Sequence, residues 1–220
     1  MIDLYSWQEI MILLIKKFQD QICVTLSNQI VQYYETLSLF SSGDQHIASI
    51  ANLTLDFDFE NCWDIYARLF LEKNTILFWK IFDMSFISGV TFNHPFFYND
   101  DRNSKLLSWL LKNEEIAPWI IRVAPLFDEN GVDWFPFTEA LINIFGKSKH
   151  FRDELSCNLH SMTSWGSRVP FLTSRLRLVE KLKNHKLKEI REWVVIEIEQ
   201  YEKSIKIEEI NDDEGTLGLY

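Results

Sequence analysis

Three carboxylates lie close together between Asp56 and Glu60, where acidic residues alternate with phenylalanines. Paired carboxylates can transfer protons or hold Mg²⁺, so this stretch could serve a small metal-dependent enzyme or effector. Acidic residues in a loop more commonly just interact with water. Because helical patterns flank the stretch on both sides, we predict that residues 56–60 form a loop leading into a helix near Glu60.

Cys157 and His160 have the spacing of two ligands in a zinc site. Such a site needs four protein ligands, or three and a water molecule. The sequence contains no second Cys/His pair, and we therefore predict no metal site. It also contains no glycine-rich phosphate loop and no nucleophile elbow. The sequence thus predicts no catalytic residue and no cofactor.

Basic residues concentrate between Arg168 and Glu192, where eight lysines and arginines stand against three glutamates in a chain of net charge −10. One interpretation is a solvated helix face with ordinary ion pairs. The other is a patch near His185 that binds an acidic partner surface or nucleic-acid phosphates. The candidate partner-binding residues, expected to lie outside the buried stripe, are Arg168, Arg175, Arg177, Lys181, Lys186 and Lys188.

An aromatic cluster, Phe96, Phe97 and Tyr98, lies in the longest irregular stretch of the sequence, residues 91–103. Such a cluster could be an exposed anchor for a partner protein. More often, such a cluster covers the edge of the core. The three residues are therefore candidates for partner binding, with both interpretations open.

The clearest helical pattern runs from Trp165 to Glu209, with a polar break at Asn184-His185. Apolar residues recur there at steps of three and four, which indicates two amphipathic helices that pack antiparallel. The first buries Val169, Leu172, Leu176, Val179 and Leu182, widened by Phe171 and Leu178. The second buries Leu187, Ile190, Val194, Ile198, Tyr201 and Ile205, widened by Trp193 and Ile196.

Looser helical patterns fill the sequence before this pair. Residues 4–39 form one long helix or two helices broken near residues 19–21. Asn74-Thr75 is a plausible cap between a helix from Glu60 and the next one. The remaining predicted helices cover residues 46–55, 104–111, 114–127, 135–145 and 149–159, with a turn at residues 128–131.

The second helix of the last pair carries Ile190-Arg191 near its start. This resembles the second helix of a HEAT repeat, in which the arginine supports packing between neighbouring repeats. Lys188 and Glu189 stand where that family often has an aspartate. The resemblance implies a stack of antiparallel helix pairs.

A second resemblance covers about the last third of the chain. Phe137–Glu139, Trp165–Ser167 and Arg191–Trp193 are similar to C-terminal helical-repeat segments of large bacterial proteins. Some of those proteins are defence-associated ATPases. This resemblance implies a subunit of a larger bacterial assembly with a role in antiviral defence.

Composition is typical of an ordinary globular protein, with 47% hydrophobic and 25% charged residues. Seven glycines and five prolines argue against an all-β fold, which needs many tight turns. Three separated cysteines fit a reducing cytosol. The apolar run Ile10–Ile15 is too short for a membrane span. These features predict a cytoplasmic protein with no membrane partner.

The sequence thus predicts an all-α, HEAT-like α-solenoid with degenerate repeats. Residues 1–210 form a single helical-repeat domain, and residues 211–220 a flexible, acidic and glycine-containing tail. Stacked helix pairs present an extended surface that can vary without harming the core. The favoured function is a non-catalytic protein-interaction module or subunit, with another protein chain as partner; a homo-oligomer is a further option. The alternatives are the effector that uses residues 56–60 and an acidic immunity or inhibitor protein.

Overall fold

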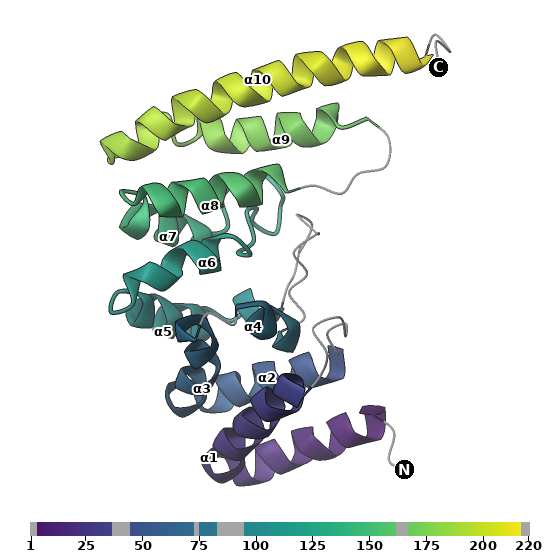
Figure 1. The fold of residues 1–220 in the computed structure, drawn as a ribbon, viewed down its shortest axis with the longest axis vertical. Coiled ribbons are helices and arrows are strands. Elements are labelled where there is room, and N and C mark those ends of the chain that lie inside the picture. Colours follow the sequence, from purple (N-terminus) through teal and green to yellow (C-terminus); the bar gives the residue numbers. More distant parts are fainter. Residues whose placement is uncertain (1–3, 37–44, 73–74, 83–94, 162–166, 217–220) are drawn as a thin grey trace. The chain divides into compact units, whose positions relative to one another are not determined.

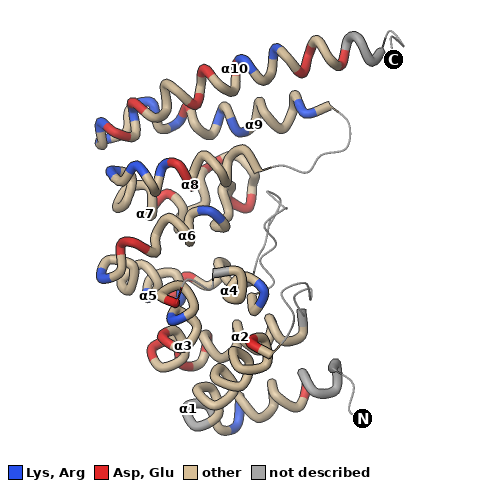
Figure 2. The backbone as a smooth tube through the Cα atoms, in the orientation of Figure 1, with Lys and Arg blue, Asp and Glu red and all other residues tan. Residues whose placement is uncertain are grey.

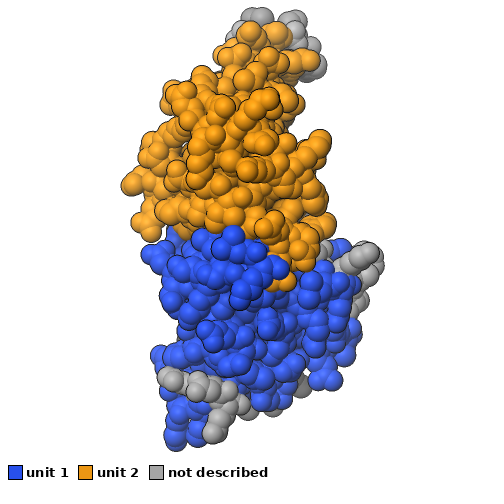
Figure 3. Space-filling model, turned by 90° about the vertical axis from the view of Figure 1, so that its left-hand side faces the viewer, with its two compact units in different colours: residues 1–86, 93–112 blue, residues 87–92, 113–220 orange. Residues whose placement is uncertain are grey.

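The computed structural model describes residues 4–36, 45–72, 75–82, 95–161 and 167–216. Helices make up the regular structure of these residues, and the only β contact among them is an isolated bridge between Phe127 and Trp134. The all-α prediction is confirmed. None of the described helices is long and apolar enough to cross a membrane. The chain divides into two compact units, residues 1–86 with 93–112, and residues 87–92 with 113–220 (Figure 3).

Unit 1 is built on one long N-terminal helix. Residues 19–21 do not interrupt it, so the single-helix alternative is correct. Its buried Ser27 donates to Thr54 Oγ1 at 3.1 Å, and Thr54 Oγ1 lies 3.1 Å from Tyr66 Oη, which links three helices through the core. The elements of unit 1 are α1 (Leu4–Thr36), α2 (Gln45–Phe57), α3 (Phe59–Leu71), α4 (Thr75–Ile81), η1 (Pro95–Phe97) and α5 (Asp100–Leu110).

Unit 2 ends in the predicted antiparallel pair, which the structure confirms (Figure 1). Ser167 Oγ, just before the first helix of the pair, donates to Asp212 at 2.5 Å near the end of the second. The second helix continues to Thr216, six residues into the segment that the sequence predicted to be a tail. The elements of unit 2 are η2 (Glu114–Ile116), α6 (Ala117–Ile121), α7 (Pro136–Phe145), α8 (Lys149–His160), α9 (Val169–Glu180) and α10 (Lys188–Thr216).

The residues that α9 and α10 bury differ in two ways from those that the apolar spacing in the sequence predicts. Arg175 and Glu197 are buried, although both are charged. Ile196, which the sequence predicted to widen the buried face of α10, is 54% exposed. Trp193 is buried as predicted, and its indole N–H donates to Ser156 Oγ of α8 at 2.9 Å.

The turn at residues 128–131 is present as predicted. Asp128 N donates to Asp133 O at 2.8 Å, and Gly131 has a φ of 69°, which glycine adopts without steric cost. The Asp128 carboxylate accepts the backbone N–H groups of Val132 and Asp133, each at 3.0 Å. These hydrogen bonds lower the pKa of Asp128, because they stabilise its ionised form.

Candidate functional site between α3 and α5

Helix α3 begins immediately after α2, with Asp58 as the one residue between them. The Asp58 side chain caps α3 by accepting the backbone N–H of Asn61 at 3.4 Å and its side-chain amide at 2.9 Å. The apolar spacing of α3 then buries Phe59, Trp63 and Tyr66 on one face. Glu60 is left exposed at the start of the helix.

Helix α5 is capped by Asn99, whose side chain accepts the Arg102 N–H at 3.0 Å. The Arg102 guanidinium is buried and donates to Asn52 Oδ1 at 2.6 Å, to Asn52 O at 3.1 Å and to Phe96 O at 3.0 Å. It also forms an ion pair with Asp56. Burial lowers the pKa of Arg102, and Asp56 opposes that shift. Arg102 therefore holds α5 and η1 against α2.

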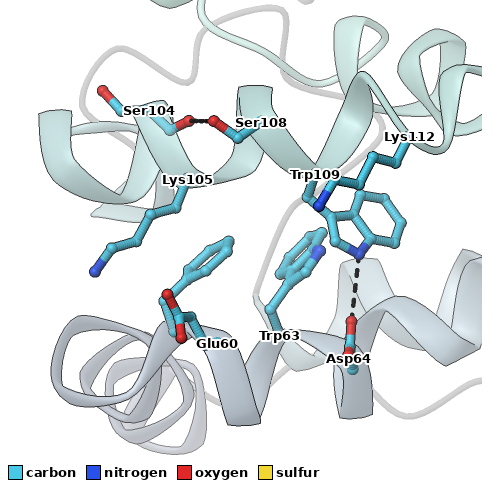
Figure 4. Close-up of a pocket in the computed structure, with 9 residues that line it drawn as sticks. Glu60, Trp63, Asp64, Ser104, Lys105, Ser108, Trp109 and Lys112 are labelled. Carbon is cyan, nitrogen blue, oxygen red and sulfur yellow. Dashed lines mark hydrogen bonds between the residues drawn. The ribbon is translucent and has the colours of Figure 1, made fainter.

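An open groove of about 460 Å³ lies between the two helices (Figure 4). Side chains of α3 face those of α5 across it. The lining residues are Phe59, Glu60, Trp63 and Asp64 from α3, and Ser104, Lys105, Ser108, Trp109 and the following Lys112 from the α5 segment. The groove is confined to unit 1.

Aromatic rings form the floor of the groove. The rings of Phe59 and Trp63 stack with centroids 5.4 Å apart and planes 7° apart. Trp109 meets Trp63 edge to face at 5.4 Å, and Phe78 meets it from the core side at 5.8 Å. Because Trp63 is enclosed by these contacts and is only 1% exposed, the floor is held rigidly in place.

Charged groups of both signs line the rim. Lys105 Nζ forms an ion pair with Asp101 at 2.8 Å, and that hydrogen bond raises the pKa of Lys105. The indole N–H of Trp109 donates to Asp64 at 3.3 Å, which fixes the partly exposed ring over the groove. Lys112 is exposed and makes no ion pair with any described residue. The rim can therefore pair with charges on a ligand.

The two serines of the groove are already engaged as donors. Ser104 Oγ donates to Asp100 O at 2.9 Å, and Ser108 Oγ donates to Ser104 O at 3.0 Å. Their hydroxyl protons are thus used by the helix itself, and the oxygens remain as acceptors. The combination of an aromatic floor, acceptor hydroxyls and a mixed-charge rim suits binding of an amphipathic segment.

The acidic stretch predicted as a loop is distributed over three structural roles. Asp56 belongs to the last turn of α2 and pairs with Arg102 and with Asn99, whose amide donates to it at 2.6 Å. Asp58 caps α3, and Glu60 lies on the rim of the groove. Among the described residues, no three His, Cys, Asp or Glu side chains gather into a possible metal site.

The aromatic cluster covers the core edge rather than standing free. Phe96 and Phe97 are fully buried, and Tyr98 is partly buried. Phe96 packs against Trp63 at 6.1 Å and against Phe82 at 5.0 Å. The exposed-anchor interpretation is therefore wrong for Phe96 and Phe97, because the chain from η1 to α5 turns them inward beneath the groove.

Basic residues do line α9 and the start of α10, with acidic residues interspersed (Figure 2). Arg175 is only 1% exposed, so its inclusion in a surface patch is wrong: its position on the helix coincides with the buried face between Leu172 and Val179. Lys181 donates to Val132 O at 2.9 Å and pairs with Asp133. Lys188 pairs with Glu192 at 3.2 Å.

The other three residues of the predicted patch are exposed: Arg168, Arg177 and Lys186. None of them forms an ion pair with a residue that the structure describes. Arg191, the residue that carries the HEAT resemblance, donates to His185 O at 2.6 Å and to Lys186 O at 3.1 Å. Its hydrogen bonds thus fix the turn that precedes its own helix.

The side chains of Cys157 and His160 lie in different surroundings. Cys157 is exposed, whereas His160 Nε2 lies 2.8 Å from Glu197 on α10. The same carboxylate accepts Ser156 Oγ at 2.5 Å. A serine nucleophile is normally bonded to the histidine, with the acid behind it. Here the acid lies between them, so this network is an interhelical tie of α8 to α10.

The groove was not foreseen from the sequence. The helical spacing placed Trp63 on a buried face, but nothing local brings Trp109 to it from 46 positions later in the chain. A weak signal existed around α5, where Lys105 and Lys112 are seven positions apart, the spacing of two helical turns, although the helix itself ends at Leu110. That spacing indicates a charged side without showing what lies opposite.

Comparison with known proteins gave no match: no protein-family model, no curated protein and no solved structure is significantly similar to this chain.

Proposed function

We propose that this chain is a non-catalytic protein-interaction module and that the groove between α3 and α5 binds a segment of another protein chain. The observation that carries the proposal is the partly exposed Trp109, held by Asp64 over a rigid aromatic floor. Tryptophan on a pre-organised surface is typical of residues that dominate binding energy at protein interfaces. A fixed ring loses little conformational freedom when the partner binds.

The rim supports a peptide-like ligand over a small charged one. Lysines lie on the α5 side and carboxylates on the α3 side, so a segment with apolar residues and both signs of charge would be complementary. In this proposal the module belongs to a HEAT-like helical stack in the cytoplasm, as a subunit of a larger bacterial assembly. The defence role stays tied to the sequence resemblance.

Affinity capture from the source cells tests this proposal. The full chain is used as bait beside Trp109→Ala and Lys112→Glu, with Leu111→Ala as matched control, because Leu111 is 53% exposed and does not line the groove. We expect a partner that wild type and control retain and that Trp109→Ala loses by at least about tenfold, as expected for an interface hot spot. Equal retention by Trp109→Ala and Lys112→Glu would remove the groove as the binding surface.

A further inference from the structure

Helix α10 exposes an apolar stripe on the side that faces away from its buried residues. Ile196, Ile207 and Ile210 are 54%, 50% and 57% exposed. Their positions place them on one side of the helix together with Lys203, whereas Ile190, Val194 and Tyr201 point into unit 2. Three isoleucines on one exposed stripe form a surface that water solvates poorly.

Charged residues lie on this stripe and beside it, in an order that suits a second copy of the same helix. Glu199 lies on the rim of the stripe, and Lys203 and Lys206 follow it by one and two turns. None of the three forms an ion pair with a described residue. All are therefore available to an approaching surface.

An antiparallel pair of α10 helices, with the two-fold axis between residues 201 and 202, brings these groups together. Residue 196 of one copy then lies level with residue 207 of the other, so Ile196 packs against Ile207, with Ile210 one turn further on. Glu199 of one copy comes within a turn of Lys203 and Lys206 of the other. Because of the two-fold symmetry, each of these contacts occurs twice, as in an isologous interface. A parallel pair in register would instead place Lys203 against Lys203.

We propose that the exposed face of α10, defined by Ile196, Glu199, Lys203, Lys206, Ile207 and Ile210, mediates homodimerisation through an antiparallel helix pair. The occupant is a second copy of this chain, because the stripe is complementary to itself in both apolar contacts and charge. The interface lies in unit 2 and is independent of the groove in unit 1. Failure of one proposal therefore leaves the other untouched.

Sedimentation equilibrium of the full chain tests the dimer. We expect a dimer with micromolar Kd, almost fully formed at about 100 μM. Ile207→Glu should make the chain monomeric without loss of helicity, because the side chain is half-exposed and its helix backbone is unchanged. The matched control, Val132→Glu, changes a residue that is 60% exposed in the turn after Asp128 and should remain dimeric. A wild-type chain that is monomeric at about 100 μM would overturn the proposal.

Charge reversal tests the antiparallel register. Glu199→Lys alone, and Lys203→Glu with Lys206→Glu, each place like charges opposite one another and should each be monomeric. Mixed together, the two variants should form a heterodimer, because position 199 of each variant then faces residues of the opposite charge at positions 203 and 206 of the other. Homodimers of either variant as stable as wild type, or a mixture that stays monomeric, would contradict this interface.

Discussion

Each compact unit buries one arginine, and the two arginines are stabilised in different ways. Arg102 of unit 1 is 2% exposed and Arg175 of unit 2 is 1% exposed. Each guanidinium lies over a phenylalanine ring, Phe96 at 5.5 Å and Phe171 at 4.1 Å. Burial lowers the pKa of both, that of Arg175 to about 10. Both therefore remain cationic at neutral pH.

The partners of the two cations differ in kind. Arg102 reaches a carboxylate, Asp56, which is one-third exposed at the end of α2. Arg175 donates to the carbonyl oxygens of Asn158 and Leu159 at the C-terminal end of α8, at 3.0 and 2.5 Å. A helix C-terminus carries partial negative charge and unpaired carbonyls. In unit 2 a helix end thus takes the place that a carboxylate has in unit 1.

Tyr201 contributes to the arrangement in unit 2. Its hydroxyl donates to Leu159 O at 2.9 Å and interacts with Arg175. Burial raises the pKa of Tyr201, so it stays a neutral donor. A buried cation in a helical protein can thus be stabilised by backbone dipoles together with one phenol. Three substitutions test how far the two arrangements differ, and a fourth tests the carboxylate of the turn at residues 128–131.

The largest effect is expected for Arg102→Met. Asn52 Oδ1 is buried and accepts from Arg102 alone among the described residues, so the substitution leaves it unsatisfied. Breaking a buried ionic network of this kind costs about 3–5 kcal/mol of unfolding free energy. Urea denaturation measures the loss, and hydrogen exchange should accelerate in α2 and α5. A loss below about 1 kcal/mol would show that the network contributes little to stability.

Arg175→Met should cost less, about 1–3 kcal/mol. Asn158 O also accepts the Ser161 N–H at 3.2 Å, and Leu159 O also accepts Tyr201 Oη, so neither carbonyl loses its last donor. The accelerated exchange should lie in α8 and α9. A cost above that of Arg102→Met would mean that a helix end holds a buried cation more strongly than a carboxylate does.

Asp56→Asn isolates the carboxylate of unit 1, with an expected cost of about 1–2 kcal/mol. The amide oxygen can still accept from Arg102, and Asp56 is partly exposed, which weakens the ion pair through solvent screening. The same urea measurement, repeated in high salt, should show a smaller difference between wild type and variant. A difference that salt does not change would argue against an electrostatic origin.

The smallest effect concerns acid sensitivity in unit 2, which we assign to Asp128 rather than to the buried arginine. Its folded pKa lies below the ordinary value of 3.8, so its contribution is complete above pH 3.8 and is lost as the pH falls through the folded pKa. Asp128→Asn lacks this contribution throughout. The stability gap between wild type and variant should therefore close below pH 3.8, as measured by urea denaturation across a pH series. A gap that stays constant would contradict this assignment.

Local chemistry explains which features the sequence predicted correctly. The three-four spacing of apolar residues depends only on helical geometry, and it located the pair α9 and α10, the burial of Trp193 and the helix after residue 60. The turn at residues 128–131 follows from the preferences of its own residues. Helix ends were less accurate, as with α5, which begins at Asp100 because Asn99 caps it.

For some charged residues on helix faces, the sequence pattern predicted the wrong burial. Arg175 and Glu197 occupy buried positions by helical geometry, yet their residue types indicated solvent. Burial is tolerated because other helices supply partners, α8 carbonyls for Arg175 and His160 with Ser156 for Glu197. Ile196 shows the converse, an apolar residue left exposed because no described element covers that side of α10.

By itself the sequence determined an all-helical chain, most of its helices, the final antiparallel pair and the charge pattern along it, because each depends on residues within a few turns of one another. The stacking of the pairs as HEAT-like repeats stays a prediction. Only the tertiary structure decided that Phe96 and Phe97 are buried, that Arg175 caps α8, and that Trp63 and Trp109 form one groove. Those features join residues far apart in the chain, and their positions depend on packing between helices, which helical periodicity does not encode.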